Sequence, residues 1–78
     1  MENKRMELNI EGFGSFYPTD FENNNVLTNS VWNDIENAND KERILNKIKL
    51  GIPFNEEVIF SSGMGRSKSF ITFKEYQG

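Results

Sequence analysis

The sequence lacks the His and Cys residues that enzymes commonly use for catalysis, and its carboxylates are poorly spaced for that role. There is no His to act as a general base and no Cys to act as a nucleophile. Two carboxylate pairs remain, Asp34 with Glu36 and Glu56 with Glu57. Residues two apart on a helix do not face each other, and adjacent residues on a strand point to opposite faces. Neither pair converges as paired-carboxylate catalysis requires, so we expect no enzyme and no catalytic residue.

Metal and cofactor sites are equally unsupported by the residue types. Without Cys there is neither a disulfide nor a thiolate ligand, and without His the commonest zinc ligand is missing. Asp20, Glu22 and the Asn run at 23–25 do not form the ladder of a calcium-binding loop, so a solvated acidic loop is expected there. We predict no metal and no cofactor. A protein that carries a small-molecule ligand is a further alternative, and it would need a deep pocket for that ligand.

The acidic side chains are concentrated in the first half of the chain. The net charge is −3, but residues 6–40 contain seven acidic and no basic residues, whereas residues 41–78 contain seven basic and four acidic ones. Such a split bears on partners rather than on fold. The predicted partner-binding acidic surface consists of Glu7, Glu11, Asp20, Glu22, Asp34, Glu36 and Asp40. The competing interpretation is a solvated acidic face of a binding or structural domain.

The acidic surface and the composition together suggest a class of function. The eleven Asn residues indicate AT-rich coding, as in low-GC bacteria, their phages and mobile elements. Small proteins of that origin often block restriction or CRISPR enzymes by occupying a basic nucleic-acid channel. We therefore predict a small non-catalytic protein-binding module: a phage or mobile-element inhibitor of a host defence nuclease, of the anti-CRISPR or anti-restriction type.

A basic, glycine-rich segment at residues 61–69 gives the alternative function. Gly63 and Gly65 would let backbone amides converge on an anion, while Arg66 and Lys68 add positive charge. A hairpin tip of this kind can contact phosphates or enter a nucleic-acid groove. The alternative prediction is a nucleic-acid-binding protein. The simpler interpretation is a mobile, soluble turn.

The elements that would position these residues begin with a strand. Met6, Leu8 and Ile10 alternate with polar residues, which predicts a half-buried strand. We expect a hairpin that turns at residues 11–14 and extends to residue 17, although a bulge at Gly12 in one longer strand is the alternative. Residues 19–25 are polar and predict a loop, with Phe21 tucked under it.

Two helices are expected in the middle of the chain. Asn29 or Ser30 can cap a short helix that reaches Ala38. Asn39, with Glu42 three residues later, predicts a capped second helix that runs to residue 50. Gly51 stands at its C′ position, and Pro53 stops any continuation. One continuous helix over residues 30–50 is the alternative, but a phase shift in the apolar positions favours a break.

The C-terminal segments 57–60 and 69–74 predict a long hairpin whose strands carry apolar residues on both faces. Two short helices cover only one face of a small sheet, so the second face would need a lid, a partner or a second copy in a homodimer. The expected fold is α+β in the order β(β)ααββ, a small antiparallel sheet packed against two short helices. Residues 1–78 would form one domain with residues 1–5 frayed.

The expected location is the cytoplasm of a bacterial cell. No apolar run approaches the roughly 20 residues that span a bilayer, and the N-terminus lacks the apolar region of a signal peptide. The expected partner is thus a protein, such as a nucleic-acid-binding enzyme, with no membrane contact.

Overall fold

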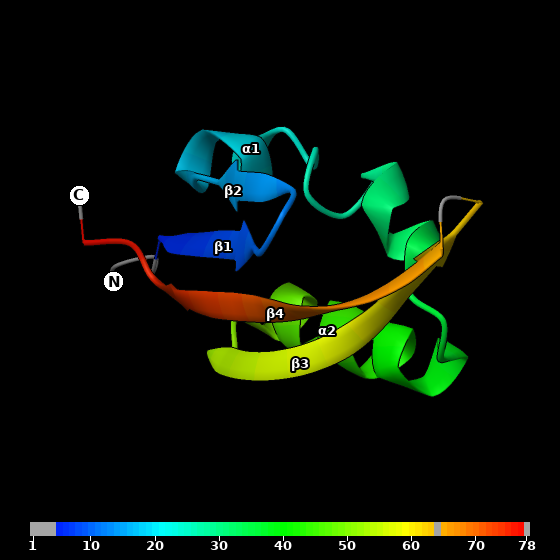
Figure 1. Cartoon of the computed structure of the whole chain (residues 1–78). Coiled ribbons are helices and arrows are strands. Elements are labelled where there is room, and N and C mark those ends of the chain that lie inside the picture. The colour runs from blue at the N-terminus through cyan, green and yellow to red at the C-terminus, as the bar shows by residue number, and fades with distance from the viewer. Residues whose placement is uncertain (1–4, 64, 78) are drawn as a thin grey trace.

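The two ends of the chain supply the sheet, and the middle supplies the helices. A computed structural model describes residues 5–63 and 65–77. The elements are β1 (Met6–Ile10), β2 (Gly14–Phe16), α1 (Pro18–Glu22), the 3-10 helix η1 (Ser30–Asp34), α2 (Ala38–Leu50), β3 (Phe54–Ser62) and β4 (Gly65–Glu75). Figure 1 shows them in the order of the chain.

The sheet is antiparallel throughout, with strand order β2-β1-β4-β3. β4 pairs with both β1 and β3, so the first and last strands of the chain are neighbours (Figure 1). The register places Leu8 opposite Phe73, and Ile10 opposite Ile71. The α+β class and the order β(β)ααββ predicted from the sequence are confirmed, as is the N-terminal hairpin, which turns at residues 11–13.

The core lies between one face of the sheet and the helices. Alternate residues of β1 and β4 point into it, and Leu8, Ile10 and Ile71 are fully buried there. Trp32 of η1 is buried as well, and its indole Nε1 donates a hydrogen bond of 2.6 Å to the carbonyl oxygen of Val26. This bond fixes the segment between α1 and η1 against the core. The core residues are Met6, Leu8, Ile10, Val26, Val31, Trp32, Ile35, Ile44, Ile48, Val58, Phe60, Ile71 and Phe73.

The loop predicted for residues 19–25 is partly wrong, because Pro18–Glu22 forms α1. Pro18 occupies the first turn, where its missing N–H costs nothing. The backbone N–H of Tyr17 donates to the Asp20 carboxylate over 2.8 Å, as in a capping box. Phe21 packs on Phe73, with ring centroids 5.7 Å apart. The expectation that Phe21 is tucked inward is thus confirmed.

The predicted break between the two central helices is confirmed, but both helices differ in extent. Asn29 caps η1, as expected. η1 then ends at Asp34, not at Ala38, because Ile35 bridges to Phe60 at the edge of β3. The cap of α2 is Asn37, whose side chain accepts from the N–H groups of residues 39 and 40; the prediction of Asn39 was wrong. Gly51 ends α2 with φ of 73°, as predicted.

The C-terminal hairpin is longer than predicted, since pairing continues to Ser62 and Gly65. The interval between the two predicted strands, residues 61–68, was expected to be a loop, which is wrong because residues 61–62 and 65–68 belong to β3 and β4. The turn comes between Ser62 and Gly65. Met64 lies outside the described residues. So do residues 1–4. Of the five residues for which fraying was expected, the structure describes Arg5, whose carbonyl oxygen accepts a hydrogen bond from the N–H of Tyr76 over 2.6 Å.

The outer face of the sheet is more polar than expected. Ile59 is half-buried and Phe70 is 48% exposed, but their neighbours on this face are mainly polar. The remaining apolar strand residues point to the core. A homodimer through this face stays a prediction, with few apolar side chains to form it. None of the helices in the described ranges is long and apolar enough to span a membrane.

Candidate functional site: a cleft between α1 and the end of α2

The seven residues of the predicted acidic surface lie on different parts of the molecule. Glu7 is on the outer face of the sheet, away from the core, whereas Asp20 and Glu22 are on α1 and Asp40 is on α2. Glu11 is in the turn after β1, Asp34 is on η1, and Glu36 follows η1 beside β3. The seven acidic residues from the first half of the sequence are thus spread over both layers of the fold.

Several of these carboxylates are paired with cations from the second half of the chain. Glu7 lies 3.8 Å from Lys74 across the β1–β4 pair, and Asp40 lies 2.9 Å from Arg43. Glu11 instead accepts a hydrogen bond from the backbone N–H of Phe70 over 3.1 Å. Three of the seven carboxylates, those of Glu7, Glu36 and Asp40, therefore form ion pairs with cations of the second half of the chain.

The predicted anion-binding tip is organised as a strand pair. Gly65 pairs with Ser62, and Arg66 pairs with Ser61, so these backbones run in the β-ladder up to the turn at Gly63. The Arg66 guanidinium makes a two-point ion pair with Glu36, with atom separations of 2.6 and 2.8 Å. Lys68 is exposed on the outer face, opposite Ile59. The cation nearest the tip is thus already held by a carboxylate of the protein.

A hollow lies elsewhere, between α1 and the C-terminal end of α2. Its volume is about 420 Å³, which is within the range of ligand and anchor pockets. It is lined by Arg5, Met6, Pro18, Phe21, Glu22, Ile48, Lys49, Leu50, Gly51 and Phe73. We call this hollow the α1–α2 cleft.

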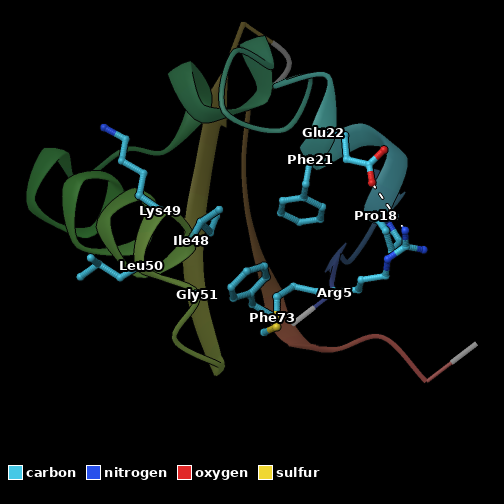
Figure 2. A pocket seen from close by; sticks show the side chains of 10 residues that line it. Arg5, Pro18, Phe21, Glu22, Ile48, Lys49, Leu50, Gly51 and Phe73 are labelled. Atoms are coloured by element: carbon cyan, nitrogen blue, oxygen red, sulfur yellow. Dashed lines mark ion pairs between the residues drawn. The ribbon is translucent and has the colours of Figure 1, made fainter. Parts of the chain in front are cut away.

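The base of the α1–α2 cleft is formed by apolar side chains, while its exposed lining is polar and apolar in about equal measure. Phe73 and Ile48 belong to the buried core, and Phe21 is half-buried over them. Figure 2 shows the side chains of Phe21 and Ile48 pointing toward each other from α1 and α2, with Phe73 below them. Lys49 and Leu50 point away from this space, so the α2 wall consists of Ile48 and the backbone near Gly51 (Figure 2).

Of the charged residues described as lining the cleft, Lys49 lies on the α2 side, whereas Arg5 and Glu22 lie at the mouth. Arg5 and Glu22 face each other there, 3.7 Å apart, with side chains 67% and 64% exposed (Figure 2). An ion pair this long and this exposed contributes little to stability. The Arg5 guanidinium is therefore easily drawn into other contacts at the mouth.

An ion-pair network fixes the α2 wall of the cleft. Lys47 Nζ lies 2.7 Å from Glu56 Oε2, and Arg43 Nε donates to Glu56 Oε1 over 3.2 Å. These bonds connect the last turns of α2 to β3. The hydrogen bonds from Arg43 first, and then from Lys47, lower the pKa of Glu56, which stabilises its carboxylate form. The network thereby holds Ile48 in place against the sheet.

The sequence contained no signal for this cleft. Phe21, Ile48 and Phe73 come from three elements, and each one alone reads as a core residue. Among residues 5–63 and 65–77, no three acidic side chains converge to hold a metal ion. No family model, curated protein or solved structure matches the chain. Its function must therefore be inferred from the geometry.

Proposed function

We propose that this protein is a non-catalytic protein-binding module that takes an apolar side chain of its partner into the α1–α2 cleft. The observation that carries the proposal is the open hollow of about 420 Å³ that has Phe73 and Ile48 at its base and polar groups around its opening. Pockets of this kind hold the anchor residues that dominate protein interfaces. The charged mouth, at Arg5 and Glu22, is suited to the polar rim of such an interface.

Two functions expected from charge remain predictions. Inhibition of a defence nuclease would need the acidic residues to act on one partner surface, and nucleic-acid binding would need the hairpin tip to reach phosphates. The cleft is the better basis for a proposal, because it combines concave shape with exposed apolar surface.

Selection from a displayed library of random peptides tests the proposal directly. We expect selected peptides to share an apolar residue and to bind the α1–α2 cleft. In Glu22→Trp, a large side chain at the mouth should obstruct entry and weaken binding about tenfold or more, as loss of a central anchor does. Glu57→Trp, the same substitution on an exposed position of the outer sheet face, is the matched control and should bind normally.

Thermal unfolding would verify that both variants are folded. Peptides that bind Glu22→Trp as tightly as the native protein, or that lose affinity only for Glu57→Trp, would contradict the proposed site.

A further inference from the structure

Two aromatic rings, those of Phe21 and Phe73, line the α1–α2 cleft, and Phe21 is the more exposed of the two. Phe21 and Phe73 contact each other with centroids 5.7 Å apart and planes tilted by 42°. Phe54 extends the group behind them, with its ring 5.6 Å from that of Phe73. Rings arranged in this way present both edges and faces, and aromatic pairs favour tilted or offset contacts at separations of 4.5–7 Å. A further ring placed in the cleft could continue the cluster.

The cation at the mouth favours the same kind of occupant. Arg5 lines the cleft and is exposed, and its only ion pair in the described ranges is the long one with Glu22. A guanidinium stacks well on the face of an aromatic ring, because the ring face is electronegative. An aliphatic side chain would gain only the apolar contacts below. An aromatic one would gain those contacts and the Arg5 contact above.

Resting on the proposed function, we propose that the anchor taken into the α1–α2 cleft is an aromatic side chain of a protein partner, packed on the Phe21 ring and on the Arg5 guanidinium. Arg5 is then the residue that sets the preference for an aromatic over an aliphatic anchor.

Two small probes of similar shape separate the aromatic contribution from simple apolar burial. N-acetyl-phenylalanine amide has a ring with a π system, whereas N-acetyl-cyclohexylalanine amide has a saturated ring of similar size. Titration of each into the ¹⁵N-labelled protein would be followed at the backbone amides of Phe21, Ile48 and Phe73. We expect the phenylalanine probe to bind about fourfold more tightly, as an exposed cation–π contact allows.

The Arg5→Gln variant should remove most of this preference while leaving binding of the cyclohexyl probe unchanged. Arg66→Gln is the matched control, since it makes the same change beside Glu36, near the hairpin tip, and should keep the preference.

The outcomes distinguish the two proposals. Equal binding of both probes at the cleft amides, or a preference that survives Arg5→Gln, would overturn the aromatic anchor and leave the binding module standing. Absence of shifts at the cleft amides with either probe, together with library peptides that do not need the cleft, would overturn the proposed function itself.

Discussion

Glu56 of β3 joins this strand to α2 through two cations. Its carboxylate bonds to Arg43 and Lys47 of α2, and its side chain is only 20% exposed. Arg43 also pairs with Asp40 one turn earlier, so four charged side chains from α2 and β3 lie in one network. Bonds of this kind are worth more than isolated surface pairs, because each side chain is already held by another.

The Glu56→Gln variant tests the network through pH. Because the pKa of Glu56 is lowered in the folded state, its stabilisation is present above the unfolded value of about 4.3 and is lost as the pH falls through the folded value. We expect Glu56→Gln to reduce the free energy of unfolding by about 1 kcal/mol at pH 7. Urea unfolding of both proteins between pH 7 and pH 2 should show this difference shrink below about pH 4.

Glu42→Gln is the control for the loss of one negative charge, since Glu42 is exposed on α2 and belongs to no ion pair in the described structure. It should unfold like the native protein at pH 7. A difference between native protein and Glu56→Gln that stays constant down to pH 2 would mean that the ion pairs do not stabilise the fold.

At the scale of the element, the start of α2 depends on one side chain. Asn37 has an extended backbone, and its Oδ1 accepts from the N–H groups of Asn39 and Asp40 over 2.8 and 3.2 Å. These are two of the orphan donors of the first turn. Asn39 lies inside the helix and is exposed.

Replacing Asn37 and Asn39 by alanine, one at a time, should show which of the two residues caps α2. Asn37→Ala is expected to cost about 1 kcal/mol, the usual loss for an N-cap. Asn39→Ala should be neutral or stabilising by a few tenths of a kcal/mol, because Ala is the better helix former. Chemical denaturation with the helical signal at 222 nm would measure both. A larger loss of stability for Asn39→Ala than for Asn37→Ala would mean that Asn37 is not the cap of α2.

Elements with a strong local signal could be predicted from the sequence, and the others could not. The alternation of Met6, Leu8 and Ile10 specifies β1, and Gly51 followed by Pro53 specifies the end of α2. α1 has five residues and no apolar periodicity, so its stability depends on its cap at Tyr17 and on the contact of Phe21 with Phe73. Such tertiary contacts override local propensity.

The candidate site could not be predicted for a related reason. A cleft is the space that packing leaves unfilled, and its walls here come from residues as distant in sequence as Phe21 and Phe73. The acidic residues and the basic tip, by contrast, stood out in the sequence. Charge patterns do not show which carboxylate pairs with which cation, and the pair between Glu36 and Arg66 joins residues 30 positions apart.

At the scale of the whole molecule, the first and last strands of the chain pair with each other and so complete the sheet. β1 and β4 lie side by side (Figure 1), and the N–H of Tyr76 bonds to the carbonyl oxygen of Arg5. β4 is a central strand, although it comes last in the sequence. The sheet therefore cannot be completed before nearly the whole chain is present, since the β1–β4 pairing joins residues more than 60 positions apart.

A circular permutant tests whether this architecture depends on where the chain begins. A short Gly-Ser linker would join residue 78 to residue 1, and the chain would be opened between Asn24 and Asn25, in the exposed turn after α1. Exposed turns tolerate such cuts. All four strands stay intact, so we expect native circular dichroism and cooperative unfolding. The loss should be about 2 kcal/mol, for the two backbone hydrogen bonds donated by Asn24 and Asn25. A second permutant opened between Ile71 and Thr72 interrupts the central strand and should not fold. Equal stability of the two permutants would contradict the central position of β4.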